Sequence, residues 1–276
     1  VGSEMCIRDR GSSYSLPGVR DAEGYTFMGW STKPMQSVSP QYEAEEKITV
    51  NGNVDLYAVV FNRTTETDLT EDQLPQVDIY KYKQVIFVGD SRTEFMENVL
   101  TGMGESATKN VKFVCSAGKG LDWFTTTGWA QLYSIVQHDS NSILSKKTAV
   151  IFNFGVNDLS KSADYAEYYN WIAPQLKSKG CELYFMSVNP VNRLMLPNAG
   201  RADRSEAAVR SFNQYMKANL SSAYTYIDMY SYLKSTGYSF ASDHYGTGTV
   251  DDGLHYTTRT YKRIFAKCMD SLRVPA

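Results

Sequence analysis

The sequence predicts a three-layer α/β/α sandwich around a five-stranded parallel sheet, preceded by a small β-rich module. Two observations predict this class. After residue 83, short and nearly continuous apolar runs alternate with longer helical patterns, which is typical of a parallel sheet covered on both faces. Before residue 63, brief runs of aromatic and β-branched residues are separated by Gly, Pro and Asn turns, which is typical of a β-rich unit.

The elements of the sandwich can be placed in order. We expect strands at 85–88, 111–115, 149–154, 182–188 and 224–227. We expect helices near 93–100, 129–137, 163–179, 204–219 and 258–272. In open sheets of this kind ligands bind beyond the carboxyl ends of the strands, so polar residues that directly follow a strand are candidate site residues.

Composition excludes several classes of function. The chain has 276 residues, of which 42% are hydrophobic, enough for one or two domains with a sizeable core. A formal net charge of -2, without a long Lys/Arg run, argues against nucleic acid as the main partner. No stretch approaches about eighteen apolar residues, so we expect no membrane span. The N-terminus shows no signal-peptide pattern, and because it begins with Val it does not indicate a location.

The first part of the chain divides into three segments. Residues 1–10, VGSEMCIRDR, show no periodicity that continues into the neighbouring segment, and we interpret them as a non-native leader. Residues 11–62 contain GYTFMGW and LYAVV, and form the β module. Residues 63–78 are polar and acidic without an apolar period, which predicts a linker. The sandwich then occupies residues 79–276.

The β module resembles the internalin-type B-repeat of bacterial surface proteins. That family has a GYxFxGW core and a closing strand that ends in LYAxW; here Val60 stands where the family usually has Trp. The opening strand expected before Gly11 is missing, so the resemblance implies a truncated copy with an unpaired sheet edge.

Four motifs in the sandwich carry candidate chemistry. Ser91 follows the first strand in VGDSRTEF, Gly118 follows the second in SAGKG, and Asn157 follows the third in GVND. Near the C-terminus, VDDGLHYT places Asp252 three residues before His255. A serine hydroxyl is a poor nucleophile until a histidine accepts its proton, and the histidine needs an acid to hold its tautomer. The four motifs, in this order, resemble the sequence blocks of the SGNH/GDSL hydrolases over residues 79–276.

This resemblance implies a strand order of 2-1-3-4-5, the flavodoxin-like order, and a serine esterase mechanism without a cofactor or a metal. It makes Ser91 the nucleophile, His255 the general base and Asp252 the residue that orients it. The oxyanion would be bound by the backbone N–H groups of Ser91 and Gly118 and by the side-chain amide of Asn157.

Residues near the expected cleft are candidates for substrate contact. We expect Arg92, Trp123 and Asn189 to bind substrate, since they follow the first, second and fourth strands. Aromatic residues in this region can equally cover the sheet, which is the alternative for Trp123 and for Phe124 beside it.

Each catalytic candidate has a simpler alternative. Ser91 could be a helix N-cap, and Asn157 could close an Asx-turn. His244 in SDHYG is the rival base, but its neighbouring Asp243 is adjacent in sequence, and adjacent side chains diverge. Asp251 is less well spaced than Asp252, and we expect His138 to be a surface residue.

The four cysteines show no CxxC or metal-ligand spacing, so we expect buried free thiols and no metal site. Cys6 lies in the leader, Cys115 and Cys181 in strands, and Cys268 in the last helix. The implied strand order puts Cys115 and Cys181 about three strand spacings, roughly 14 Å, apart, which is too far for a disulfide.

The sequence therefore predicts a serine esterase that cleaves short-chain O-acyl esters, with a small ester or an acylated glycan as its substrate. Because B-repeats occur on cell-envelope proteins, we expect an O-acetyl group on a carbohydrate or envelope glycan, and a secreted or cell-surface location. An O-acyltransferase, a thioesterase or a lysophospholipase of the same fold remain alternatives. The alternative outside enzymes is a surface-binding module with an inactive hydrolase domain.

Overall fold

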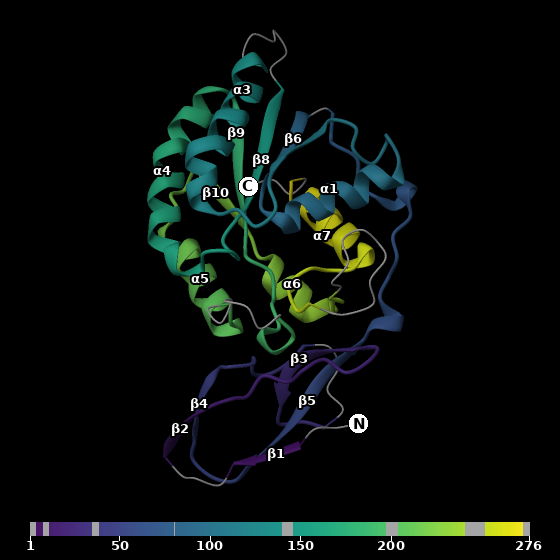
Figure 1. Ribbon diagram of the computed structural model, residues 1–276, viewed down its shortest axis with the longest axis vertical. Helices are drawn as coiled ribbons and strands as arrows, with labels where there is room; N and C mark the ends of the chain where they lie inside the picture. The colour runs from purple at the N-terminus through teal and green to yellow at the C-terminus, as the bar shows by residue number, and fades with distance from the viewer. Residues whose placement is uncertain are drawn as a thin grey trace. The chain divides into compact units, whose positions relative to one another are not determined.

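The computed structural model describes residues 4–7, 11–34, 39–79, 81–139, 146–196, 204–240 and 252–272. The chain forms two compact units, whose elements are labelled in Figure 1. The first unit contains residues 1–67, 189–210 and 230–260, and the second contains residues 68–188, 211–229 and 261–276. The first unit thus joins the N-terminal β module to two later stretches of the chain.

The second unit is built on a parallel sheet of five strands. They are β6 (Tyr82–Gly89), β7 (Val111–Cys115), β8 (Lys147–Asn153), β9 (Cys181–Met186) and β10 (Tyr224–Ile227). Their order is β10-β9-β8-β6-β7, and each neighbouring pair is parallel. Numbered along the sheet from β7, this is 2-1-3-4-5, so the predicted fold and strand order are confirmed.

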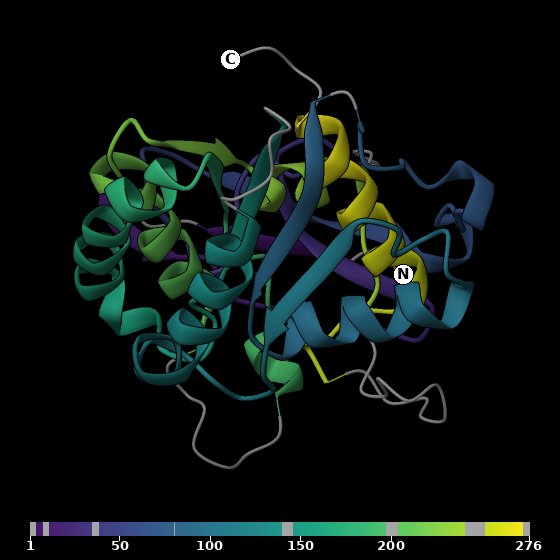
Figure 2. The ribbon, with the colours of Figure 1, turned by 90° about the horizontal axis from the view of Figure 1, so that it is seen from above.

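Helices flank the sheet, as Figure 2 shows. They are α1 (Ser91–Met103), α2 (Leu121–Trp123), the π-helical turn η3 (Phe124–Gly128), α3 (Trp129–Asp139), α4 (Ser162–Ser178), α5 (Glu206–Asn219) and α7 (Thr258–Ser271). A further helix, α6 (Met229–Thr236), belongs to the first unit except for its first residue. Five of them match the helices expected from the sequence. The helix α6 was not expected, because it is short and its pattern is interrupted by tyrosine and serine.

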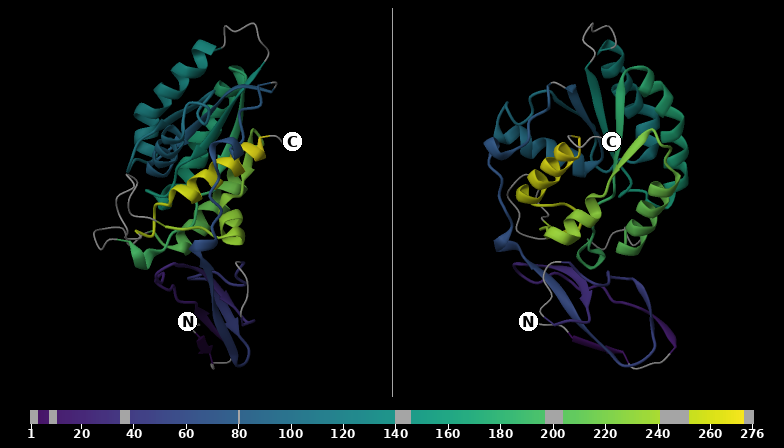
Figure 3. Two further views of the ribbon diagram at one scale, coloured as in Figure 1. Left: turned by 90° about the vertical axis from the view of Figure 1, so that its right-hand side faces the viewer. Right: turned by 180° about the vertical axis from the view of Figure 1, so that it is seen from behind.

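Aromatic contacts show that both faces of the sheet are covered. In the register of β6 with β8, Phe87 lies opposite the residue before Phe152, so these two side chains point to opposite faces. Phe87 packs against Phe265 of α7 at 5.8 Å between ring centroids, and Phe152 packs against Tyr169 of α4 at 4.7 Å. In the left view of Figure 3, α3 and the yellow α7 lie on opposite sides of the sheet.

The N-terminal module consists of antiparallel strand pairs. The strands are β1 (Glu4–Ile7), β2 (Ser12–Ser15), β3 (Tyr25–Ser31), β4 (Lys47–Val50) and β5 (Val54–Asn62), in the orders β1-β5-β3 and β2-β4. The GYTFMGW segment forms β3, in which Trp30 and Phe27 meet edge to face in a core with Leu16 and Leu56. Gly29 has a φ of 145° at a bulge, where a Cβ would lie 2.4 Å from the Tyr42 carbonyl oxygen. The β-rich module is confirmed.

One expectation about this module is wrong. Residues Glu4–Ile7 form a strand that pairs antiparallel with β5, from Glu4 opposite Tyr57 to Ile7 opposite Val54. A strand therefore precedes Gly11, and this edge of β5 is paired. A pattern of four residues is too short to predict a strand by itself; a partner strand with open hydrogen-bonding groups determines it. The non-native origin of residues 1–10 stays a prediction.

The segment 63–78 is more ordered than a polar linker requires. It contains the short 3-10 helices η1 (Arg63–Thr65) and η2 (Glu71–Gln73), and Leu74 and Val77 are buried. The predicted boundaries at residues 62 and 78 stay predictions. Within the described part of the chain, no helix is both long and apolar enough to cross a membrane.

Candidate active site

Ser91 is placed by a tight junction between β6 and α1. The strand ends at Gly89, where a Cβ would lie 2.0 Å from the Thr93 hydroxyl oxygen and 2.9 Å from the Asn153 carbonyl oxygen. Only a glycine lets the first turn of α1 approach the sheet so closely. This packing explains the glycine of the GDS motif.

The N-cap of α1 is Asp90 and not Ser91. The Asp90 carboxylate accepts the Arg92 backbone N–H at 3.0 Å, so Ser91 is the first residue inside the helix. The alternative that Ser91 serves as the cap is therefore wrong. Its side chain is at a helix N-terminus, where the backbone dipoles favour negative charge.

The loop after β7 is tied to α1. The Ala117 N–H donates to the Glu94 carboxylate of α1 at 2.6 Å, and the Ser116 N–H donates to the Gly89 carbonyl oxygen at 3.3 Å. Gly118 has a φ of 71°, the left-handed region that favours glycine. These bonds fix the loop next to the start of α1, and the oxyanion role of the Gly118 N–H stays a prediction.

The loop after β8 is tied to the same place. The Asn157 side-chain amide donates to the Lys119 carbonyl oxygen at 2.7 Å. This bond fixes the orientation of the amide group. Hydrogen bonds therefore join the loops that carry Ser91, Gly118 and Asn157 at the carboxyl ends of three neighbouring strands.

Asp158 organises this junction, and its role was not predicted from the sequence. Its carboxylate accepts the Leu121 N–H at 2.9 Å and the Tyr165 hydroxyl at 2.7 Å. A Cβ on Gly120 would lie 2.3 Å from one Asp158 oxygen. Burial raises the pKa of Asp158 above its usual range, although these hydrogen bonds oppose the shift. The signal available in the sequence was its place directly after Asn157.

Asp252 and His255 form a closed turn in the first unit. One Asp252 carboxylate oxygen lies 2.5 Å from His255 Nδ1. The other accepts the Leu254 N–H at 2.8 Å and the His255 N–H at 2.7 Å. Gly253 has a φ of 68°, so it supplies the left-handed residue that closes the turn. The side chains of Asp252 and His255 are 15% and 14% exposed, accessible to a small substrate but mostly covered.

The structure thus assembles the candidate residues in two groups. Ser91, Gly118 and Asn157 belong to the second unit, and Asp252 and His255 belong to the first. The meeting of the Ser91 and His255 side chains stays a prediction.

The rival base His244 lies outside the described residues, as do Asp243 and Asp251. His138 lies in α3.

The expected substrate contacts differ in exposure. Arg92 is 2% exposed and Asn189 is 1% exposed, so either could touch substrate only inside an enclosed site. Trp123 is partly exposed and packs near Phe154 at 6.1 Å between ring centroids. Phe124 is fully buried, so this aromatic residue covers the sheet. A substrate role for Arg92, Trp123 and Asn189 stays a prediction.

Within the described ranges, no group of three or more His, Cys, Asp or Glu side chains is arranged so that it could hold a metal ion. Cys115, Cys181 and Cys268 form no disulfide bond. Burial raises the pKa of the Cys115 and Cys268 thiols well above the usual range, which makes them poor nucleophiles.

Comparison with known proteins places both parts of the chain. Among curated proteins none matches. Solved structures that resemble it include a Bacteroides fragilis protein assigned as an acylhydrolase, 15% identical, with a TM-score of 0.46 over 74% of this chain and 92% of that one. A protein from Slackia heliotrinireducens assigned as an SGNH hydrolase is 12% identical, with a TM-score of 0.48 over 70% of this chain and 100% of that one.

A further similar structure is the C-terminal catalytic domain of peptidoglycan O-acetyltransferase A from Streptococcus pneumoniae. It is 17% identical, with a TM-score of 0.41 over 70% of this chain and 94% of that one. Residues 7–59 match the Listeria-Bacteroides repeat domain. Residues 85–268 match the GDSL-like lipase/acylhydrolase family. The chain therefore belongs to the GDSL-like lipase/acylhydrolase family.

Proposed function

We propose that this protein is a serine esterase that removes short acyl groups, above all O-acetyl groups, from a carbohydrate. Ser91 Oγ attacks the ester carbonyl carbon while His255 Nε2 accepts the hydroxyl proton. The resulting oxyanion collapses, the alcohol leaves with the proton from His255, and the acyl group stays on Ser91. Water, deprotonated by His255, then releases the acid and restores the serine.

The observation that carries this proposal is the Asp252–His255 pair. A carboxylate at 2.5 Å from Nδ1 holds the proton on that nitrogen, which leaves Nε2 as the basic atom. The same carboxylate binds two backbone N–H groups of its own turn, so the histidine ring is held by a rigid support. A simple hydrogen bond would serve any structural need of this turn equally well. The arrangement of an acid with a histidine therefore supports a chemical role.

The loops of the second unit support an oxyanion site. A backbone N–H at the start of α1, the N–H of Gly118 and one hydrogen of the Asn157 amide would supply its donors. The hydrogen bonds from Ala117 to Glu94 and from Asn157 to Lys119 fix these donors before a substrate arrives. Such preorganised donors are worth most in a site that excludes water.

The loops near the site and the N-terminal repeat support this substrate class. The expected cleft loops, around Gly118 and Asn189, are short and polar, so they offer little surface on which a long acyl chain could be buried. Each buried CH₂ would contribute about 0.8 kcal/mol only where a groove exists. The repeat over residues 7–59 is a bacterial surface-type domain, which supports an extracellular or cell-surface location and a glycan substrate.

The proposal is tested by hydrolysis of p-nitrophenyl esters from acetyl to octanoyl, with Ser91→Ala as the control. We expect kcat/KM to fall as the acyl chain lengthens and the control to be inactive. A maximum at octanoyl or longer would favour a lipase or thioesterase instead. Adding a sugar acceptor and measuring free acetate against acetylated sugar distinguishes hydrolysis from acyl transfer.

A further inference from the structure

We propose that Asn192 is a positioning residue that couples the N-terminal β module to the turn carrying Asp252 and His255. The inference rests on the proposed function, since it concerns the histidine of that mechanism. It assigns to the repeat a part in catalysis, beyond attachment to a surface. All the residues that carry it belong to the first unit.

The side chain of Asn192 binds the β module. Its amide nitrogen donates to the Val19 carbonyl oxygen and to an Asp21 carboxylate oxygen, both at 2.9 Å. Its amide oxygen accepts the Leu194 N–H at 3.2 Å, which orients the amide so that the nitrogen faces the module. Both amide hydrogens are therefore used on the repeat.

The backbone of Asn192 binds the catalytic turn. Its N–H donates to the Gly253 carbonyl oxygen at 2.8 Å. A Cβ on Gly253 would lie only 2.3 Å from the Asn192 carbonyl oxygen, so the two backbones are in close contact. The turn thus rests directly on the Asn192 backbone, with no side chain between them. A shift of Asn192 must shift Gly253, and with it Asp252 and His255 of the same turn.

The anchor in the β module is itself held firmly. Asp21 is fully buried and accepts the Arg63 guanidinium at 2.6 Å and the Phe27 N–H at 3.0 Å. Arg63 also donates to the Thr26 hydroxyl at 2.9 Å. A buried carboxylate with this many partners has one position, so Asn192 is bound to a fixed point of the repeat.

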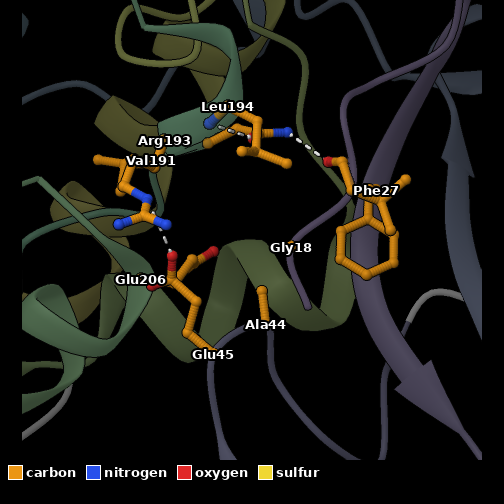
Figure 4. Close-up of a pocket in the computed structure, with 10 residues that line it drawn as sticks. Gly18, Phe27, Ala44, Glu45, Val191, Arg193, Leu194 and Glu206 are labelled. Carbon is orange, nitrogen blue, oxygen red and sulfur yellow. Dashed lines mark hydrogen bonds and ion pairs between the residues drawn. The ribbon is translucent and has the colours of Figure 1, made fainter. Parts of the chain in front are cut away.

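Neighbouring contacts keep the stretch around Asn192 on the module. Glu45 pairs with Arg193 at 3.3 Å and accepts the Ala207 N–H at 3.1 Å. Figure 4 shows a small pocket lined by residues of the module, such as Glu45 and Phe27, and of the later stretch, such as Arg193 and Leu194, with the Glu45–Arg193 ion pair as a dashed line. The repeat consequently acts as a support for the histidine turn.

The decisive variant is Asn192→Asp. It has nearly the same shape but replaces the donor by an oxygen, which would face the Asp21 carboxylate and the Val19 carbonyl oxygen. We expect kcat for p-nitrophenyl acetate to fall between about tenfold and a hundredfold with little change in KM, because misplacement of a catalytic group of about 1 Å has effects of that size. The rate at which a fluorophosphonate probe labels Ser91 should fall by the same factor.

Asn170→Asp is the matched control. Asn170 also bridges two backbone groups, donating to the Asn219 carbonyl oxygen at 2.9 Å and accepting the Ser221 N–H at 2.8 Å, but it lies in the second unit. We expect its kcat and labelling rate to stay within about twofold of the wild-type values. A loss equal to that of Asn192→Asp would mean that any such change reduces activity, and would overturn the assignment.

Asn192→Ala tests the coupling if Asn192→Asp fails to fold. It removes the bonds to the repeat without adding a charge and keeps the backbone bond to Gly253, so a smaller fall in the same direction is expected. Folded Asn192 variants that label at the wild-type rate would overturn the coupling. A wild-type protein that the probe does not label at Ser91 would overturn the proposed function instead.

Discussion

Asp252 and His255 are joined twice. One carboxylate oxygen accepts the His255 backbone N–H at 2.7 Å, and the other lies 2.5 Å from His255 Nδ1. The backbone bond sets the distance between the two residues, and the side-chain bond sets the rotation of the ring. Within the turn, the orientation of the His255 ring is therefore set by Asp252.

His255→Ala should lower kcat by several orders of magnitude, about 10⁴-fold or more, because the proton acceptor is lost. Asp252→Ala should cost less, since water can partly replace an orienting group. His138→Ala is the control and should leave kcat unchanged. Steady-state kinetics with p-nitrophenyl acetate measure all three, and an active His255→Ala enzyme would show that another residue is the base.

Gly253→Ala should lower both stability and kcat. At a φ of 68° an alanine is strained by about 1–2 kcal/mol, and its Cβ would in addition lie 2.3 Å from the Asn192 carbonyl oxygen. Gly24→Ala is the matched control, because Gly24 has a φ of 74° with nothing within 4 Å. Urea denaturation should show the larger loss for Gly253→Ala, and kinetics should show that Gly24→Ala retains its activity. Equal losses for the two variants would rule out a close approach of Asn192.

Asn157→Ala should lower kcat about a hundredfold to a thousandfold with KM little changed, as expected for the loss of one oxyanion donor. A donor that acts in the transition state affects kcat more than substrate binding. Parallel measurement of the unfolding free energy separates this effect from loss of the bond to Lys119. An unchanged kcat in the folded variant would exclude Asn157 from the oxyanion site.

Glu182→Gln should lower stability in a pH-dependent way. Burial alone raises the pKa of Glu182, but hydrogen bonds from Lys147, at 2.6 Å, and from Tyr82 outweigh it and lower the pKa to about 2. A depressed carboxyl pKa stabilises the folded state above the unfolded pKa of about 4.5, and this contribution is lost as the pH falls toward 2. Urea denaturation should show a difference between wild type and variant at pH 7 that shrinks by pH 3. A difference that does not change with pH would contradict the ionised pair.

The sheet could be predicted because its strands are continuous apolar runs. Some observed strand ends differ by a few residues from the expected ones, because backbone groups there form hydrogen bonds outside the sheet. The fourth strand, expected to reach Val188, ends at Met186 because the Val188 N–H donates to the Asn213 side chain at 2.7 Å. Such a bond joins residues that are distant in sequence, and no local pattern reveals it.

The turn that pairs Asp252 with His255 could also be predicted, because Asp252, Gly253 and His255 interact within one turn. The strand at Glu4–Ile7 and the contacts of Asn192 could not. Both depend on groups of distant segments: the backbone of β5 in one case, and the backbones of Val19 and Gly253 with the Asp21 carboxylate in the other. A backbone hydrogen bond has no residue preference that would mark its partner in the sequence.

Activation of Ser91 by His255 is tested most directly by one measurement. The wild-type protein and His255→Ala are incubated with a fluorophosphonate, and the site and rate of labelling are determined by mass spectrometry of peptides. We predict one adduct on Ser91 of the wild type, with a rate at least about a hundredfold lower in His255→Ala. Equal labelling of the two proteins, or an adduct on a serine other than Ser91, would contradict it.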